Sequence, residues 1–527
     1  MSAGLHIYGD KNVQVPKHLN FGKYLLERMK QGNDRIALVN ADTLEKITYQ
    51  EFIQNAVNLA SELMKLGIGR GDIIAVGSEK RNELGPTILA ILLTGAAYTA
   101  YDLESGKFAL QHKISVARPN YFIFSKSFWE RYSDVLSTAE SIQTLMTLDD
   151  GHSSALSIKS FTNNYIDIKS FEPAEVNEES DLALILYSSG TTGMPKGVRL
   201  THLNCIISSI PYDLDLSIKT IYTCGEWYHN YDTFSMYKFL SVGRKIVYLR
   251  DVTSEKIMKC IDDYKINMAM LLPNLIVGFC KIDGTKNYNM EALKIIYSRA
   301  APLHSKTIEN VKQRFPKVQE IFQGYGMTEC GELTSEYRGT KGSKPGSVGM
   351  ASPGIILKIS DLNTGKTLGP NERGEIRAKG SVLMNGYIGI DPATYLDEDG
   401  FLKTGDWGYY DDDKYFYIVD RIKEILCYNG DQVPPLELET ILQLHPEVLE
   451  AGVVGKQDEE HGDIPTAFVV LQPGSEVTEQ ELIDYVSAEV PPFMQLKGGV
   501  KFISKLPRNP RGKILRRELR KILNETN

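Results

Sequence analysis

The stretch LALILYSSGTTGMPKGV, from Leu182 to Val198, carries the strongest signal for the fold of this 527-residue chain. It begins with six apolar or aromatic residues and no polar break, which is the pattern of a strand buried on both faces of a parallel sheet. Hydroxyl residues and glycines follow at once. Because glycine readily adopts positive φ, this loop can curl into a concavity of backbone N–H groups, and Lys196 adds a positive charge. The stretch therefore predicts a buried strand followed by an anion-binding loop.

The loop is not a P-loop, which reads G-x-x-x-x-G-K-[ST]. Counted from Gly190, Pro195 stands at the second glycine position and Gly197 at the Ser/Thr position. The loop instead resembles the phosphate-binding signature of the adenylate-forming superfamily, whose members include acyl-CoA synthetases, coumarate:CoA ligases and firefly luciferases. Over the whole chain the resemblance is closest to insect luciferase-like acyl-CoA synthetases. It implies that the β- and γ-phosphates of ATP bind to Ser188, Ser189, Gly190, Thr191, Thr192, Gly193 and Lys196.

The bulk composition is that of a globular protein, with 42% hydrophobic and 24% charged residues. The formal net charge of −8 argues against a nucleic-acid partner, because polyanion binders usually carry net positive charge. The six cysteines form no C-x-x-C pair, so neither a disulfide framework nor a zinc site is indicated. No signal peptide, no apolar stretch of membrane-spanning length and no C-terminal S-K-L is found, and we expect a cytosolic protein.

Short apolar runs alternate with helical patterns from Ile36 onward, which predicts βαβ units and an α/β fold with parallel-rich sheets flanked by helices. Helical patterns cover Tyr49–Leu66 and Asn82–Ala97, and Thr201 is a plausible cap of a later helix. The polar residues 140–180 predict a surface connection. The final 105 or so residues mix short strands and helices, and the family resemblance implies two domains: an ATP- and acyl-binding domain over 1–420 and a mobile α+β lid domain over 421–527.

A second motif, KIIYSRAAPL at 294–303, resembles the family strand and turn that carry the adenine ring. The turn requires small side chains so that a flat ring can approach closely. The resemblance assigns this contact to Ala300, Ala301 and Pro302.

A third motif, QGYGMTE at 323–329, follows a short apolar run. Gly324 and Gly326 allow the backbone to approach a nucleotide, and Tyr325 can stack on adenine. The resemblance implies that Thr328 donates to the α-phosphate. Glu329 is placed to hold Mg²⁺, which favours carboxylate and phosphate oxygens.

The C-terminal third supplies the remaining family motifs. Asp406 matches the aspartate that accepts both ribose hydroxyls, and Arg421 also reaches the ribose. The segment DRIKE matches the family hinge and contains Asp420 and Lys423. Lys513, beside a glycine in the last motif, would be delivered by the lid to bridge the substrate carboxylate and the α-phosphate.

A lone histidine such as His229 is more often packed than catalytic, but the family resemblance places its segment along the acyl pocket. The aligned pocket positions are Ser208, His229, Tyr231, Arg299, Glu332 and Leu333. Arg299 stands where the relatives generally have glycine, and Arg299 and Glu332 could pair with each other or with polar groups of the substrate. Unpaired charge is costly to bury, so these residues favour a small aromatic or polar acid over a long fatty acid.

The resemblance implies an enzyme that uses ATP, Mg²⁺ and coenzyme A to adenylate a carboxylic acid and then transfer the acyl group to the thiol of CoA. Cys427 replaces a family lysine tied to the second step, so adenylation is better supported than thioester formation. An alternative is a luciferase-type oxidoreductase that adenylates a luciferin and oxidises it with O₂. A third possibility, a binding protein without turnover, is disfavoured because the motif residues are all present.

Overall fold

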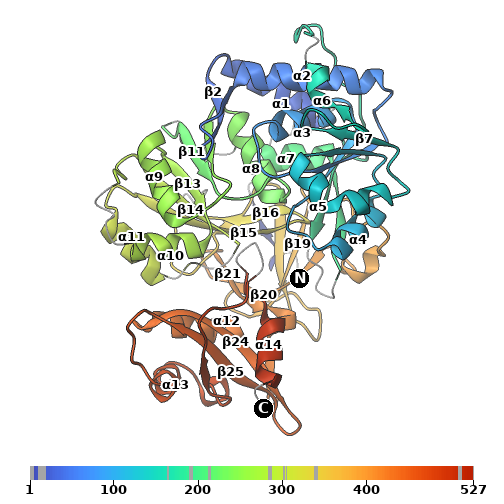
Figure 1. Cartoon of the computed structure of the whole chain (residues 1–527). Helices are drawn as coiled ribbons and strands as arrows, with labels where there is room; N and C mark the ends of the chain where they lie inside the picture. Colours follow the sequence, from blue (N-terminus) through green and yellow to red (C-terminus); the bar gives the residue numbers. More distant parts are fainter. Residues whose placement is uncertain are drawn as a thin grey trace.

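The computed structural model describes residues 5–9, 19–162, 165–188, 194–211, 215, 217–282, 288–300, 303, 305–336, 342–508 and 513–525. Strands in this part of the chain form four sheets. Figure 1 shows a large lobe and, beneath it, a smaller lobe formed by the orange-red to red end of the chain.

The first sheet contains the strand predicted at Leu182. Its order is β10 (Lys196–Thr201), β9 (Leu182–Ser188), β5 (Ala97–Tyr101), β4 (Ile73–Gly77), β6 (Tyr121–Phe124), β7 (Thr144–Thr147) and β8 (Leu156–Ser157). All neighbours are parallel except β9 and β10. The interior of β9 is buried from Ala183 to Tyr187, as its unbroken apolar run predicts.

The second sheet is longer and also mostly parallel. Its order is β17 (Met350–Ala351), β16 (Gly331–Ser335), β15 (Glu320–Met327), β14 (Ile295–Ser298), β13 (Met268–Leu271), β11 (Thr220–Thr223), β12 (Lys245–Tyr248), β2 (Ile36–Asn40) and β3 (Lys46–Thr48). Antiparallel pairs occur at its two ends, β15–β16–β17 and β2–β3. The motifs at 294–303 and 323–329 therefore lie on adjacent strands of one sheet, β14 and β15.

Helices cover and connect these sheets. In the large lobe they are α1 (Phe21–Met29), α2 (Tyr49–Lys65), α3 (Leu84–Leu93), α4 (Lys107–Ala117), α5 (Lys126–Ser137), α6 (Ile158–Thr162), α7 (His202–Ser209), α8 (Asn230–Leu240), α9 (Ser254–Tyr264), α10 (Pro273–Lys281) and α11 (Ser305–Arg314). α7 packs on β9 and β10, whereas α8 packs on α7 and on β12 and β16. These two helices thus join the first sheet to the second.

A third, antiparallel sheet completes the large lobe. Its order is β1 (Ile7–Tyr8), β18 (Ile355–Ser360), β19 (Gly374–Gly380), β20 (Leu402–Tyr410) and β21 (Phe416–Arg421). The smaller lobe has its own sheet, β23 (Asp431–Val433), β22 (Leu426–Tyr428), β25 (Gly462–Leu471) and β24 (Val448–Asp458), with β26 (Val500–Phe502) paired to β25. Its helices are α12 (Pro435–Leu444), α13 (Glu479–Ser487) and α14 (Arg516–Glu525). The mixed α+β pattern predicted for this lobe is confirmed.

Several sequence predictions can be compared directly with these elements. α2 matches its predicted range within one residue, and Thr201 caps α7 by accepting a hydrogen bond from the backbone N–H of Asn204. α3 is shorter than predicted, because the apolar run continues past its end into β5. The prediction of a plain surface connection over 140–180 is wrong, since β7, β8 and α6 lie there. β7 and β8 are short strands at the edge of the first sheet, where few buried side chains are needed. No helix in the described ranges is long and apolar enough to cross a membrane.

Candidate active site

The phosphate-loop prediction can be examined at its two ends. Ser188 closes β9 and Lys196 opens β10, and the antiparallel register sets these two residues opposite each other. Tyr387 joins them to the third motif: its hydroxyl donates to Glu329 Oε1 at 2.7 Å, and Lys196 Nζ lies 5.1 Å from its ring centroid. Lys196 and Glu329, predicted to meet phosphate and Mg²⁺, therefore flank one tyrosine. Several predicted residues lie outside the described residues: Ser189, Gly190, Thr191, Thr192, Gly193, Ala301 and Pro302.

Glu329 is suited to a hard cation. Its side chain is buried, and of its two carboxylate oxygens the structure shows Oε1 occupied by the Tyr387 hydroxyl. The described residues contain no cluster of three or more potential metal-ligating His, Cys, Asp or Glu side chains. Mg²⁺ usually binds through one or two carboxylates together with substrate phosphates and water, so a single buried carboxylate beside Lys196 fits that ion.

The predicted ribose site is assembled around Asp406, which is 3% exposed. Its Oδ1 lies 2.6 Å from Arg421 Nε, and its Oδ2 accepts a hydrogen bond from the Tyr325 hydroxyl at 2.5 Å. Burial raises the pKa of Asp406, while the Arg421 charge opposes that rise. Burial, together with the Asp406 charge, raises the pKa of Tyr325 well above its ordinary value. Three residues predicted separately to contact the nucleoside are therefore in direct contact.

Lys513, from the smaller lobe, reaches the same place. Partial desolvation lowers its pKa, and so does the nearby Arg421 charge, whereas Asp406 acts in the opposite direction. The side chain still keeps exposed surface. The C-terminal lysine thus lies within electrostatic range of the predicted ribose site, with the small lobe in the arrangement drawn in Figure 1.

The predicted hinge connects the two lobes by hydrogen bonds. Asp420, near the end of β21, accepts from the backbone N–H of Arg421 at 2.7 Å and from that of Leu436, in α12, at 2.8 Å. Lys423 lies in the short 3-10 turn that follows β21, and its positive charge contributes to the lowered pKa of Lys513. Asp420 of the predicted hinge thus contacts α12 of the smaller lobe, and Lys423 lies within electrostatic range of Lys513.

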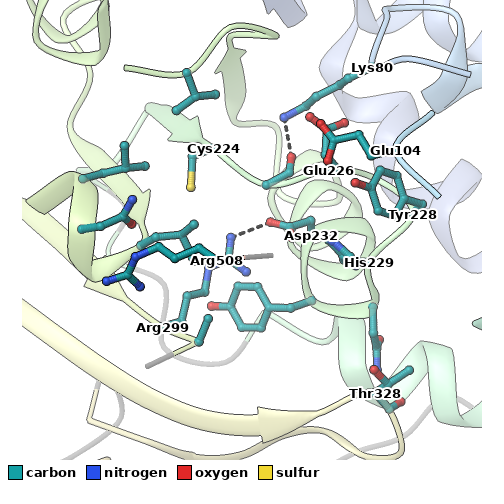
Figure 2. A pocket seen from close by; sticks show the side chains of 18 of the residues that line it. Lys80, Glu104, Cys224, Glu226, Tyr228, His229, Asp232, Arg299, Thr328 and Arg508 are labelled. Carbon is teal, nitrogen blue, oxygen red and sulfur yellow. Dashed lines mark hydrogen bonds and ion pairs between the residues drawn. The ribbon is translucent and has the colours of Figure 1, made fainter. Parts of the chain in front are cut away.

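Four of the six acyl-pocket candidates line a cavity of about 1770 Å³. Lys505–Arg508 and Ile522 of the smaller lobe line it together with residues of the large lobe (Figure 2). The predicted site residues in its wall are His229, Tyr231, Arg299, Ala300, Gly324, Tyr325, Gly326, Thr328 and Glu332. Ala300 has a φ of 70°, in the left-handed region, where a bulky side chain would be strained.

Two predicted pocket residues lie behind this wall. Ser208 lies next to Gly331, which lines the cavity. A Cβ atom built on Gly331 would be 3.2 Å from the Ser208 hydroxyl oxygen. Leu333 is fully buried and packs in the core cluster of the antiparallel sheet with Leu357 and Ile376. Its side chain therefore contributes to packing in this structure.

The two charged residues of the predicted pocket do not pair with each other as one interpretation of the sequence suggested. Arg299 Nη2 forms an ion pair with Asp232 Oδ1 at 2.6 Å, and the guanidinium lies 3.6 Å from the ring centroid of Tyr231. Glu332 Oε2 accepts a hydrogen bond from the Tyr297 hydroxyl at 2.9 Å. Arg299 and Glu332 each bind a neighbour on a different element, because α8 brings Asp232 closer to the end of β14.

The helix α8 also supports the phosphate side of the site. His229 is its N-cap, and the side-chain amide of the next residue, Asn230, donates to the backbone carbonyl of Thr328 at 2.7 Å. His229 and Thr328 are thereby held on one wall of the cavity. The catalytic role given to His229 stays a prediction.

Sequence reasoning missed three residues of this region: Lys80, Asp232 and Tyr387. Lys80 is buried three residues after the end of β4, donates to the Gly225 carbonyl at 2.5 Å, and lies over the rings of Trp227 and Tyr248. For Asp232 a signal was available, because it follows the predicted acyl segment directly. No local pattern marks Tyr387 as a partner of Glu329.

The comparisons with known proteins agree with this geometry. The family model for the AMP-binding enzyme matches residues 25–388, and that for the AMP-binding enzyme C-terminal domain matches 437–513. This chain belongs to the AMP-binding, adenylate-forming enzyme family. Neither match locates the boundary between 420 and 421, which stays a prediction.

Relatives with two different activities are similar over nearly the whole chain. A luciferin 4-monooxygenase of Photuris pensylvanica is 34% identical over 95% of this chain and 94% of its own length. A 4-coumarate-CoA ligase of Narcissus pseudonarcissus is 31% identical over 97% and 94%. The crystal structure of ATP-bound MatB from Rhodopseudomonas palustris is 26% identical with a TM-score of 0.84, covering 96% of this chain and 100% of that one. The α/β fold with a large N-terminal and a small C-terminal domain is confirmed.

Proposed function

We propose that this enzyme activates a small aromatic or polar carboxylic acid with ATP, releases pyrophosphate, and transfers the acyl group from the adenylate to the thiol of coenzyme A. The observation that carries the proposal is the convergence of Lys513 from the smaller lobe on the Asp406–Arg421 pair of the large lobe. That arrangement sets a cation of the smaller lobe near a predicted ribose site, which supports activation at the adjacent α-phosphate.

In the first step a carboxylate oxygen attacks the α-phosphorus, and the bond to the bridging oxygen of pyrophosphate breaks with its electron pair on the leaving group. Fixed cations aimed at the developing charge supply most of such catalysis. Lys513 would contact the carboxylate and the α-phosphate, and Lys196 the departing pyrophosphate. Mg²⁺ bound to Glu329 would neutralise phosphate charge. The Asp406 carboxylate would hold the ribose, with Arg421 and Tyr325 fixing its orientation.

In the second step the CoA thiol loses its proton as sulfur attacks the acyl carbon, and AMP leaves. The 4-coumarate-CoA ligase relative supports this step. The luciferin 4-monooxygenase relative supports a second candidate, oxidation of an adenylated luciferin by O₂. Cys427, exposed on β22, stands where both groups have a lysine and so does not separate them. The cytosolic location also stays a prediction.

The test is ATP–pyrophosphate exchange over a panel of carboxylic acids, followed by AMP release with and without CoA. Light emission with ATP, O₂ and candidate luciferins is measured in parallel. CoA-dependent AMP release without light is the expected result. Light that does not depend on CoA would assign the oxidative step instead.

Lys513→Ala should lower exchange by roughly 10²- to 10³-fold, because it removes one fixed charge from the transition state, while ATP binding stays largely intact. Lys497→Ala, which alters an exposed lysine of the same lobe, should leave exchange unchanged. Unchanged exchange in Lys513→Ala would refute the role given to that lysine.

A further inference from the structure

The inner wall of the cavity contains a buried arginine that is held in place on two sides. Arg299 follows β14 and is 8% exposed. Asp232 of α8 holds one end of its guanidinium at 2.6 Å, and the face of the guanidinium rests on Tyr231. Planar contact with a ring and an ion pair together fix both the position and the plane of the group. Arg299 is therefore a rigid part of the cavity wall rather than a flexible surface side chain.

The hydrogen-bonding capacity of Arg299 is not used up. A guanidinium carries five N–H donors and no acceptor. The ion pair with Asp232 uses Nη2, and Nε is buried without an acceptor among the residues that the structure describes. Buried donors in native proteins are nearly always paired, so the donors left on this guanidinium at the cavity wall favour a ligand acceptor there. The missing partner must be an acceptor, which for a biological acid means oxygen.

The surrounding charges favour such an oxygen. Asp232 faces a second buried cation, Lys80, whose pKa is lowered first by burial, while Glu226 and Asp232 oppose that shift. Burial raises the pKa of Glu226, and the Lys80 charge opposes that rise. Asp232 is the acidic partner of Arg299, and its charge also acts on Lys80. An additional electron-rich group near Arg299 would be attracted rather than repelled.

The position of Arg299 gives this acceptor a place in the substrate. Figure 2 shows Thr328, predicted to contact the α-phosphate, and Arg299 on opposite sides of the view. Both Thr328 and Arg299 line the same cavity. An acid whose reacting carboxylate lies at Thr328 therefore extends its other end toward Arg299.

We propose that the acid activated by this enzyme carries an oxygen acceptor at the end remote from the reacting carboxylate, and that Arg299, positioned by Asp232, binds this oxygen. The inference rests on the proposed function and narrows its substrate class. A hydrocarbon end would leave the remaining guanidinium donors at the cavity wall unpaired and would place methyl groups against a buried ion pair. Sites built to hydrogen-bond a substrate group discriminate strongly against analogues that lack it.

The test compares matched acids by ATP–pyrophosphate exchange with the full-length enzyme. One series is hexanoate, monomethyl adipate and adipate, and the other is 4-methylbenzoate, monomethyl terephthalate and terephthalate. Each series holds the reacting carboxylate constant while the far end changes from hydrocarbon to neutral oxygen acceptor to carboxylate. In at least one series, kcat/KM should be about 10- to 100-fold higher with an oxygen acceptor than without it. A higher kcat/KM with the ester than with the second carboxylate would indicate a neutral acceptor, and the reverse order would indicate an anionic one.

Variants connect the preference to the ion pair. Arg299→Met with Asp232→Asn removes both charges together, so that neither is left buried alone. In this double variant the kcat/KM values of the oxygen-bearing and hydrocarbon acids should differ by no more than about 3-fold. The kcat/KM should rise with the hydrocarbon acid and fall with the oxygen-bearing acids. The single variant Asp232→Asn keeps the arginine and should weaken the preference only in part. Arg70→Met with Asp181→Asn removes an ion pair outside the cavity and should leave the preference unchanged.

Two results are distinguishable. Hydrocarbon acids exchanged as fast as their oxygen-bearing partners, or a preference unmoved in the double variant, would overturn this inference and leave the adenylation proposal standing. No exchange with any acid in either series, with AMP binding intact, would overturn the proposed function and with it the inference.

Discussion

Replacing Glu375 by alanine should weaken nucleotide binding, although Glu375 is not in the cavity wall. Its Oε1 accepts from the backbone N–H of Gly405 at 3.2 Å, and its Oε2 accepts from Arg377 Nε at 2.9 Å. Gly405 has a φ of 72° and immediately precedes Asp406 in the bulged strand β20. Glu375 is therefore a positioning residue for the carboxylate predicted to hold the ribose.

The size of the effect follows from the contact. A hydrogen bond to a charged group contributes about 1.5–3 kcal/mol. The Thr404 hydroxyl, which accepts from the backbone N–H of Asp406 at 3.1 Å, still holds the turn after the substitution. We therefore expect about half of that energy to be lost from binding, or about 0.8 to 1.5 kcal/mol, which is about a 4- to 12-fold rise in the Kd for AMP.

Isothermal titration with AMP measures the change, and thermal unfolding measures stability in the same samples. Glu375→Gln keeps an acceptor for Gly405 but turns an amide toward Arg377, so its Kd should be intermediate. Lys379→Ala, an exposed position on the same strand, should bind AMP normally. An unchanged Kd in Glu375→Ala together with a lower Tm would show that Glu375 serves only packing of the sheet, and the reasoning would be wrong.

Two further substitutions test separate features. Burial lowers the pKa of His202 from 6.5 to about 4, and its Nδ1 accepts from the backbone N–H of Phe21, so the folded protein keeps this ring neutral where the unfolded chain binds a proton. The free energy of unfolding should fall by up to about 3 kcal/mol as the pH drops from 6.5 to 4, and His202→Gln should flatten that part of the denaturation profile; an identical profile would contradict this. Cys427→Lys restores the family lysine and should raise CoA-dependent AMP release while leaving pyrophosphate exchange unchanged. If pyrophosphate exchange and CoA-dependent AMP release change together, position 427 does not act specifically on the second step.

The parts of the fold that depend on local sequence were predictable. The unbroken apolar run of β9 and the capping of α7 by Thr201 are set by residues within one element, and both appear in the structure. The antiparallel sheet β18–β21 was largely missed, because pairing between its strands depends on contacts far apart in the chain. The edge strands β7 and β8 were missed for a different reason: few of their side chains are buried, so they have little hydrophobic pattern.

The candidate site also combines features that local sequence predicts with features that depend on contacts far apart in the chain. Motifs identified Asp406, Arg421 and Tyr325 one at a time, whereas only the structure shows that their side chains contact one another. Tyr387 could not have been predicted, since it lies 58 residues from Glu329 and belongs to no motif. Spacing in sequence does not encode the register between a loop and a strand.

The partner of Arg299 could have been narrowed by physical reasoning alone. A buried guanidinium requires an acid nearby, because an unpaired buried charge is strongly destabilising. Glu332 was considered because it is another aligned pocket position, but Asp232 is better placed: it lies in the first turn of α8, where the helix dipole stabilises a carboxylate. The Tyr297 hydroxyl already donates to Glu332. An arginine at a position where the resembled family generally has glycine thus calls for a compensating acid, here at the start of a neighbouring helix, and in our proposal this pair selects the acids that the cavity accepts.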